Sequence, residues 1–328
     1  MDSRFLVVGD VHWRAVNPKA RTDDFQAALA GKLMEIFGLA RQHRCAAILQ
    51  TGDLTDTAGL QLSTIGDLME ILREAPCPVL AVPGNHDTWG ANPDTLPRTP
   101  FGLLVRGGWL QDVSQQPFRM TNGDFPVVIT GRGYDAETDL DPGQYTAPPA
   151  EPGVFRIHLS HGMLLRRAPG MPLRHTTLEQ LADLPNLPDV LINGHEHLTH
   201  WIQRVGQTLV LKPGALARLT AHVEEIHRPI QVMLLSITDA GAQVQDIALQ
   251  SARPGAEVLS RDHLVEAAER EDNMEAFLAL LQGNDQMKFL NTLEMTDQLA
   301  GEMNLPPLVV TDAKARLTRA REELGSVA

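Results

Sequence analysis

Five short apolar runs in this chain each end in a cluster of polar residues, and this arrangement constrains the fold more than any other feature. The runs are Phe5–Val8, Ala46–Leu49, Val79–Val82, Phe155–Leu159 and Val190–Ile192. Each has the length and the apolar content of a buried strand. Two stretches with helical periodicity, about Asp23–Arg41 and Leu60–Arg73, separate the first three runs. Alternating strands and helices predict a parallel sheet in this part of the chain.

The pattern changes from about residue 125, where strands follow one another without long helices between them. Further strands are expected at Val127–Thr130, Thr208–Lys212, Ile230–Ile237 and Gln243–Leu249, with a hairpin turn at Asp239–Gly241. The proline-rich segment Asp135–Gly153 is interpreted as an irregular loop, either a lid or plain surface. The sequence therefore predicts an α/β fold in which two packed sheets form a β-sandwich flanked by helices.

A change of composition after Arg253-Pro254-Gly255 indicates a second part of the chain. We expect a catalytic domain over residues 1–252 and a helical C-terminal appendage over residues 253–328. From Leu264 to Leu299 the apolar residues keep a helix-like spacing. A last helix is expected at Thr311–Leu324, with Thr311 or Asp312 as its N-cap.

Charge and composition narrow the setting in which such a chain works. The formal net charge of −13 argues against a broad basic surface that would hold nucleic acid by phosphate neutralisation alone. Two cysteines, Cys45 and Cys77, do not suggest a disulfide framework. The sequence has no apolar stretch near the roughly 20 residues that cross a bilayer, and its first residues lack the pattern of a secretory signal. We therefore expect a soluble, cytoplasmic protein with no membrane partner.

The polar clusters after the five runs contain residue types that bind metal ions. In chain order they are Gly9-Asp10-Val11-His12, Gly52-Asp53-Leu54-Thr55-Asp56, Gly84-Asn85-His86-Asp87, Ser160-His161-Gly162 and Gly194-His195-Glu196-His197. Ligands bind beyond the carboxyl ends of strands in an open α/β sheet, so these clusters can converge. Imidazole nitrogens, carboxylate oxygens and one amide oxygen suit two divalent transition metals, and a carboxylate can bridge them. Two such ions promote displacement at phosphorus, which predicts phosphoester hydrolysis.

Each motif taken alone has a structural alternative, because an Asp-x-His after a strand is more often a capped turn than a metal ligand. Five motifs in order, each at the end of an expected strand, favour the metal site. Two histidines outside the ligand set receive structural interpretations: His158 is expected to support its strand, and His200 to lie at the surface or behind the ligands.

The ordered set resembles the calcineurin-like metallophosphoesterase superfamily, whose pattern is D-x-H, G-D-x-x-D, G-N-H-D/E, a single His and G-H-x-H. The resemblance covers about residues 4–250 and implies a β-sandwich flanked by helices. It also implies a division of roles among the motif residues. The implied ligands are Asp10, His12 and His197 for the first metal, Asn85, His161 and His195 for the second, and Asp53 as the bridge.

The same resemblance places the general acid on His86. Asp87 would then orient the imidazole of His86 and raise its basicity, as carboxylates do for a histidine partner. Asp56 would support the site from behind the ligands. Mn²⁺ is the expected metal, while Fe²⁺ and Zn²⁺ accept the same ligands.

Weaker signals concern the substrate. The segment Leu211–Arg218 is similar to the Pro-Gly-Ser stretch of DNA-repair nucleases of the SbcD kind, with Ala215 where Ser is usual. That similarity implies DNA as substrate and a coiled-coil ATPase (SbcC-like) as partner of the C-terminal tail. Arginines after His161 and tryptophans beside the motifs also fit nucleic acid, since arginines neutralise phosphates and an aromatic ring can stack on a base. These residues are Arg166, Arg167, Arg174, Trp13 and Trp89.

Each of these substrate signals has an alternative. Loop arginines are usually a solvated face, and a tryptophan beside a metal site is as often a packing wall. The leading hypothesis is an SbcD-like DNA exonuclease or endonuclease. The second is a small-molecule phosphodiesterase or phosphatase that acts on cyclic nucleotides or phosphorylated metabolites, which the acidic charge favours slightly. A third, a scaffold with a degraded site, disagrees with the full set of ligands.

Overall fold

The computed structural model describes residues 3–122, 125–149, 152–238 and 241–262, and then 296–297, 300–301, 303 and 305–325. It divides the chain into two compact units, Met1–Ser260 and Arg261–Ala328. The first unit extends past residue 252 because Val258 and Leu259 pack against Ala20 and Ala221.

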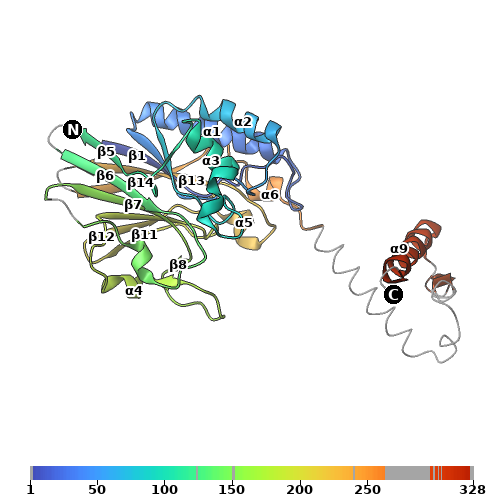
Figure 1. Cartoon of the computed structure of the whole chain (residues 1–328). Coiled ribbons are helices and arrows are strands. Elements are labelled where there is room, and N and C mark those ends of the chain that lie inside the picture. Colours follow the sequence, from blue (N-terminus) through green and yellow to red (C-terminus); the bar gives the residue numbers. More distant parts are fainter. Residues whose placement is uncertain are drawn as a thin grey trace. The chain divides into compact units, whose positions relative to one another are not determined.

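The first unit is built on two six-stranded sheets (Figure 1). In the first sheet the strands β1 to β4 run parallel, β13 pairs antiparallel with β1, and β14 with β13. The spatial order is β14-β13-β1-β2-β3-β4. The bounds are β1 Ser3–Val8, β2 Ala47–Gln50, β3 Val79–Ala81, β4 Gln111–Asp112, β13 Gln231–Thr238 and β14 Gly241–Ala248.

The second sheet has the order β11-β12-β10-β7-β6-β5. Its four central strands are parallel, and the edge strands β5 and β11 are antiparallel to their neighbours. The bounds are β5 Phe118–Asn122, β6 Phe125–Arg132, β7 Phe155–His161, β10 Val190–Gly194, β11 Trp201–Val205 and β12 Thr208–Lys212. A small sheet pairs β8 Leu164–Leu165 with β9 Thr176–Thr177.

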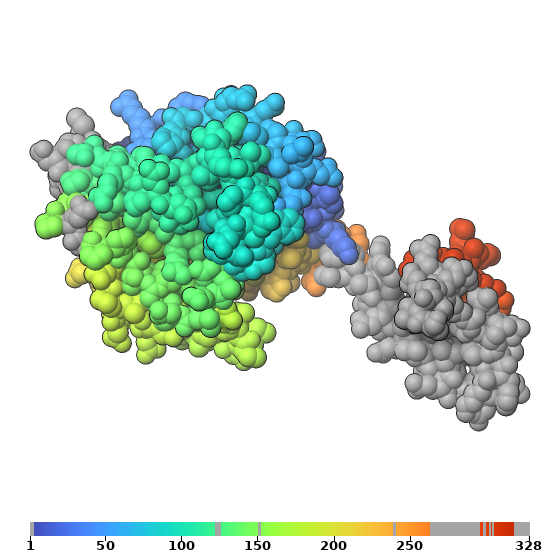
Figure 2. All heavy atoms as spheres, viewed as in Figure 1, coloured from blue at the N-terminus to red at the C-terminus, as the bar shows by residue number. Residues whose placement is uncertain are grey.

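Side chains that alternate along the strands build the layers. In β1, Phe5 and Val7 face the core between the two sheets, while Leu6 and Val8 face the core under the helices. Such alternation is the rule in a strand whose neighbouring side chains point to opposite faces. The expected β-sandwich with helices outside is therefore confirmed. Figure 2 shows the blue N-terminal segments above the green segments of the second sheet.

The helices lie outside the sheets, and α1 and α2 cover the first one (Figure 1). Asp24 caps α1, because its carboxylate accepts from the backbone N–H of Ala27 at 2.9 Å. The helical bounds are α1 Phe25–Gln42, α2 Leu62–Leu72, η1 Pro93–Arg98, α3 Pro100–Arg106, η2 Pro142–Tyr145, α4 Leu178–Ala182, α5 Val223–His227 and α6 Gly255–Val258. The expected loop Asp135–Gly153 contains η2, and Tyr145 from it is buried.

The second unit is described chiefly by α9, Pro307–Gly325. The expectation of an N-cap at Thr311 or Asp312 was wrong, because the helix begins at Pro307, whose fixed φ suits a first turn. The Thr311 hydroxyl instead donates to the carbonyl of Pro307 at 2.9 Å, inside the helix. The helical spacing expected between Leu264 and Leu299 lies mostly outside the described residues, as do residues 239–240 of the expected turn. In the described part of the chain no helix has the length and apolarity to span a membrane.

Candidate metal centre

The ends of β1, β2, β3, β7 and β10, with the loops that follow them, bring together all seven ligands expected from the sequence. The described residues contain three groups of potential metal-binding atoms. The third holds His12, Asp56 and His86, and the two others are adjacent and share Asp53. One group contains Asp10, His12, Asp53 and His197, and the other contains Asp53, His161 and His195, with Asn85 between the last two. Asp53 therefore has the place of a bridging carboxylate.

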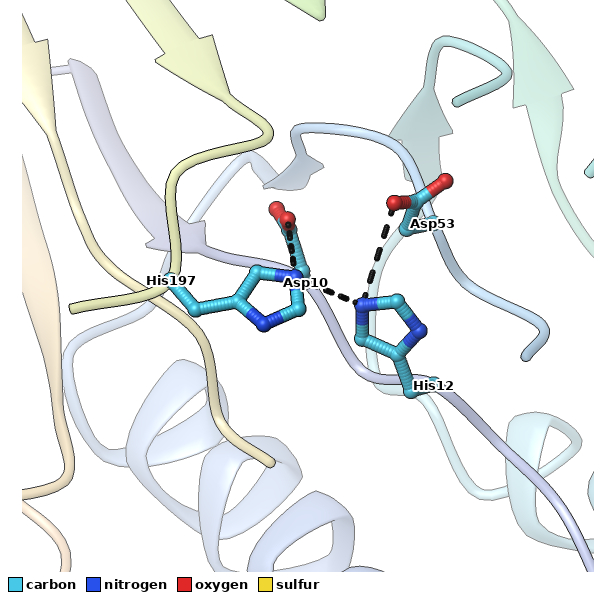
Figure 3. Close-up of side chains that lie close together, drawn as sticks. All are labelled: Asp10, His12, Asp53 and His197. Atoms are coloured by element: carbon cyan, nitrogen blue, oxygen red, sulfur yellow. Dashed lines mark hydrogen bonds and ion pairs between the residues drawn. The ribbon is translucent and has the colours of Figure 1, made fainter. Parts of the chain in front are cut away.

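The first group forms where the loop after β1 meets the loop after β10 (Figure 3). Nε2 of His197 lies 3.4 Å from Oδ2 of Asp10 and 2.9 Å from Nε2 of His12. Nε2 of His12 lies 3.8 Å from Oδ2 of Asp53. Asp10, His12 and Asp53 are almost fully buried, whereas the His197 side chain is 26% exposed. The open side of this group is therefore at His197.

The second group has a similar arrangement around the other side of Asp53. Nε2 of His161 lies 3.3 Å from Oδ2 of Asp53 and 3.2 Å from Oδ1 of Asn85. Nδ1 of His195 lies 2.9 Å from the same Asn85 oxygen and 3.2 Å from Nε2 of His161. His195 thus presents Nδ1 where the other three histidines present Nε2.

These donor sets fit divalent cations. Nδ1 of His161 lies 2.8 Å from the carbonyl oxygen of Thr51, which can only accept, so Nδ1 carries a proton and Nε2 is the atom that faces Asp53 and Asn85. Burial, helped by the nearby His161 and His12 respectively, lowers the pKa of both His195 and His197 to about 3. Both rings are therefore neutral and able to coordinate at neutral pH. Converging lone pairs of this kind need a cation between them.

Charge within the centre is concentrated on Asp53. Burial by itself would raise the pKa of Asp53, but His161 and then His12 outweigh it and hold the pKa below its usual range. Burial likewise opposes protonation of His161, and Asp53 reverses this and raises the pKa of His161 to about 9. The Asp10 carboxylate accepts from the backbone N–H of His195 at 3.1 Å, which ties the two sheets together at the site.

Backbone strain collects at the ligands. His12, Asp53 and His195 have φ angles of 52°, 50° and 91°, in the left-handed region that non-glycine residues rarely adopt. Such strain persists where the surrounding structure fixes it, and it clusters at functional sites. Gly84 has a different reason to be glycine, because a Cβ there would lie 2.1 Å from Oδ1 of Asp53.

His86 lies beside the first group, and its ring centroid is 4.8 Å from that of His12. Nδ1 of His86 lies 2.7 Å from the carbonyl oxygen of Asp56, so Nδ1 donates and Nε2 is left for a substrate. The Asp56 carboxylate is paired with Arg14 at 2.9 Å and lies 3.4 Å from Nδ1 of His12. Asp56 therefore supports the site, as expected, and its carbonyl orients His86.

The expected contact between the Asp87 carboxylate and the His86 imidazole was wrong. Asp87 is fully buried and accepts from the backbone N–H groups of Thr55 and Gly84, both at 2.9 Å, and from the Thr55 hydroxyl at 2.8 Å. The carboxylate points into the loop because these donors would otherwise stay unsatisfied. Burial, with the charge of Asp53, raises the pKa of Asp87 to about 6.

Of the residues expected to touch substrate, one is buried and the others lie at the surface. Trp13 is buried, and its indole N–H donates to the Thr64 carbonyl at 2.8 Å, so the expectation that Trp13 stacks on a base was wrong. Trp89 is 52% exposed. Arg166 and Arg167 line a recess of about 390 Å³ together with Glu196. In the sequence, Glu196 lies between the ligands His195 and His197. Arg174 donates to the carbonyl of Ala136 at 2.8 Å.

Several residues that complete the site were not expected. The Tyr134 ring stacks on the His195 ring, with centroids 5.4 Å apart and planes at 29°. Lys212 is fully buried beneath the last motif, where Nζ lies 3.2 Å from Glu196 and donates to the Leu164 carbonyl at 2.7 Å. Arg14 could have been considered from the sequence, because it stands two positions after His12. Tyr134 lies in no motif, so nothing in the sequence pointed to it.

Comparison with known proteins decides the family. The model of the calcineurin-like phosphoesterases matches residues 3–198, more than half of the chain. The chain belongs to the calcineurin-like phosphoesterase family. It is thus a metallophosphoesterase, a metal-binding hydrolase of phosphoesters. No curated protein matches the sequence.

Three solved structures that match this metallophosphoesterase have low sequence identity to it. The protein TT1561 of Thermus thermophilus is 15% identical, with a TM-score of 0.46 over 75% of this chain and 99% of that one. The calcineurin-like phosphoesterase YfkN from Bacillus subtilis is 14% identical, with a TM-score of 0.45 over 75% and 90%. A dimetal phosphatase from Danio rerio is 13% identical, with a TM-score of 0.45 over 75% and 98%.

Proposed function

We propose that this metallophosphoesterase is a two-metal phosphodiesterase that cleaves DNA, as an SbcD-like nuclease. The observation that carries the proposal is the recess lined by Arg166, Arg167 and Glu196, since Glu196 lies between the ligands His195 and His197 in the sequence. A nucleic acid carries phosphates at regular spacing along its backbone. With one phosphate at the metal centre, the recess offers two arginines to a neighbouring phosphate.

The side chains around the recess support such a contact with phosphate. The guanidinium of Arg166 lies 5.3 Å from the centre of the Trp201 ring, a cation–π geometry that steadies the side chain. Arg167 is exposed, so it can reach a ligand without a change in the core. Trp89, on the loop after His86, presents an exposed ring on which an unpaired base can stack.

The chemistry follows from the residues that surround the centre. Divalent ions held by the seven ligands would activate a water and neutralise charge on the phosphoryl oxygens. Nε2 of His86 is free of protein partners among the described residues, so the imidazolium form of the ring, with Nδ1–H held by the Asp56 carbonyl, gives its Nε2 proton to the leaving oxygen and becomes neutral. The Asp56 carbonyl holds that ring in place, and Arg14 fixes the Asp56 side chain in turn.

A small-molecule phosphodiesterase or phosphatase is the second candidate, and one observation favours it. The net charge of −13 opposes long contacts with a polyanion, whereas a nucleotide needs only the metal centre and one basic recess. For the metal, Mn²⁺ remains our proposal over Fe²⁺ or Zn²⁺. A coiled-coil ATPase remains the proposed partner for the C-terminal unit, where the α9 side chains Leu308 and Val309 are 85% and 49% exposed.

The test is hydrolysis by the purified full chain with Mn²⁺, Fe²⁺ or Zn²⁺. The substrates are linear single- and double-stranded DNA, cyclic nucleotides and a chromogenic diester.

The double variant Arg166→Gln/Arg167→Gln should weaken DNA binding. It should also reduce the slope of log K against log salt concentration by about 1.8, for two lost phosphate contacts on duplex DNA. Arg204→Gln, an exposed arginine on β11, is the matched control. Absence of DNA cleavage with every metal, together with turnover of cyclic nucleotides, would support the second candidate instead.

A further inference from the structure

A second cluster of basic residues lies away from the ligands, at the start of α1. Arg21, Lys32, Arg218 and Arg253 line a recess of about 210 Å³, together with Asp23 and Asp24. Arg21, Lys32 and Arg218 are 8%, 2% and 4% exposed. Three cations buried this deeply are unusual, because removing a charge from water is costly unless a partner compensates it.

Two of these cations have no carboxylate partner among the described residues. Nζ of Lys32 donates to the carbonyl of Leu216 at 2.7 Å. Arg218 donates to the carbonyls of Glu225, Arg253 and Arg228 at 2.9, 2.9 and 2.8 Å. Carbonyl groups accept hydrogen bonds but bring no negative charge. Lys32 and Arg218 therefore have no ion-pair partner among the described residues, and Glu225, the carboxylate nearest in effect to Arg218, already pairs with Arg228.

The acids that line the recess are already engaged. Asp23 accepts from Nε and Nη2 of Arg21 at 2.8 and 2.7 Å, and Asp24 caps α1. Arg253, at the exposed edge, pairs with Glu257 at 3.2 Å. None of these carboxylates contacts Lys32 or Arg218 within ion-pair distance in the described structure.

The basic side chains of the recess also have N–H donors without an acceptor among the described residues. A lysine ammonium has three N–H donors and a guanidinium has five. Lys32 uses one, and Arg218 uses three in the described structure. Nη1 of Arg21 is buried and has no hydrogen-bond partner among the described residues. Buried polar groups are nearly always paired, so these donors point to a ligand that supplies acceptors.

We propose that this recess binds a phosphate group, at a site separate from the metal centre. A phosphate dianion would give Lys32 and Arg218 the ion-pair partner that they lack among the described residues, and its oxygens match the free donors. At about 30 Å³ per water molecule, 210 Å³ holds about seven waters, enough for a phosphate ion. Burial, followed by Arg21, Arg218 and Arg228, lowers the pKa of Lys32 to about 7, and a bound dianion would reverse this.

One residue touches both sites. The carbonyl of Leu216 accepts from Lys32, and the N–H of Leu216 donates to the backbone carbonyl of Asp10 at 2.8 Å. The phosphate recess therefore lies one residue away from a ligand loop of the metal centre, but it shares no side chain with the centre.

Calorimetric titration of the metal-loaded full chain with inorganic phosphate tests the proposal. Wild-type protein should bind one phosphate per chain more than Lys32→Met, whose side chain keeps the length of lysine without its charge. Loss of a charged hydrogen bond should weaken phosphate binding at the recess about tenfold to hundredfold. Lys19→Met, an exposed lysine nearby, should bind as wild type does. Equal phosphate binding by wild type and Lys32→Met would overturn the proposal.

Arg253→Gln gives a second test that does not alter the core, since this side chain is largely exposed. It should weaken phosphate binding at the recess, and unchanged binding would count against the site even if Lys32→Met failed to fold. A parallel titration with a nucleoside 5′-monophosphate identifies the source of the group. Tighter binding than inorganic phosphate, lost in Lys32→Met, indicates a nucleotide, and equal binding indicates free phosphate.

Discussion

The backbone N–H of His86 donates a hydrogen bond of 2.8 Å to Oδ1 of Asp53. Oδ2 of the same carboxylate faces His161 and His12, at 3.3 and 3.8 Å. One oxygen of Asp53 therefore serves the metal centre, and the other fixes the loop that carries the proposed acid. Any change that moves Asp53 should disturb metal binding and proton transfer together.

Gly84→Ala should displace the Asp53 carboxylate, because the new Cβ would lie 2.1 Å from Oδ1. We expect a loss of bound metal and of turnover by at least about a hundredfold, the scale of effect that a displacement of about 1 Å has on catalysis. Metal analysis and diester hydrolysis measure the two effects. Gly66→Ala, in α2 with open space around it, is the control and should stabilise the protein by about 1 kcal/mol. Full metal content in Gly84→Ala would show that Asp53 is not held by this contact.

His86→Ala should keep its metals and lose turnover by about 10²–10⁴-fold, the usual contribution of a general acid. The effect should shrink for a diester whose leaving group needs no proton. Parallel kinetics with a nitrophenyl and an alkyl leaving group measure this difference. His227→Ala, an exposed histidine on α5, should behave as wild type. An equal loss with both leaving groups would argue that His86 does not act as an acid.

Tyr134→Ala should weaken metal binding, because the stacked ring holds His195 in the orientation that presents Nδ1. Loss of a group that orients a ligand costs about tenfold to hundredfold in metal affinity. Tyr134→Phe keeps the ring and should retain that affinity. Competition with a metal-binding dye measures both variants. If the two variants weakened binding equally, the hydroxyl would matter more than the stacking.

His158 should make stability depend on pH. Burial, with nearby Arg132, lowers the pKa of His158 to about 4, while the unfolded chain has its ordinary value near 6.5. The unfolded chain therefore binds a proton first, and this contribution to stability is present above pH 6.5 and is lost as the pH falls towards 4. The full loss is about 3 kcal/mol at 1.36 kcal/mol per pKa unit.

His158→Leu should remove that part of the acid sensitivity. Urea unfolding of both proteins between pH 7.5 and 4 measures it, and the difference in unfolding free energy between them isolates His158 from the carboxylates of the site. His227→Leu is the exposed control. Parallel pH profiles for wild type and His158→Leu would contradict the buried, neutral state of the His158 ring.

The strands that carry ligands could be predicted because four of their runs are apolar without interruption, and the fifth, in β7, alternates apolar residues with Arg156 and His158. β11 could not, because Ile202, Gln203 and Arg204 are exposed on an edge strand and give no buried run. The ligands could be predicted because their types and order leave few structural alternatives. The residue types of the five motifs are therefore enough to predict a metal-binding site.

The direction of a side chain could not be predicted. Trp13 turns into the core because the Thr64 carbonyl accepts its indole N–H. Asp87 turns into its loop because Thr55 and Gly84 offer donors there. Which nitrogen of each histidine faces the metals depends on such contacts as well. Residue types and their order do not reveal these choices, because they depend on which donors and acceptors the fold brings close, such as Thr55 for Asp87 and Thr64 for Trp13.

Metal stoichiometry tests the central claim most directly. Native mass spectrometry of the full chain with Mn²⁺ should find two ions per chain in wild type, because two ligand groups share Asp53. Asp53→Asn removes the shared charge and should lose at least one ion and nearly all turnover. The control Asp67→Asn, whose carboxylate lies on α2 and accepts only from Gln26 among the described residues, should keep both ions. One ion in wild type, or two retained by Asp53→Asn, would contradict a centre bridged by Asp53.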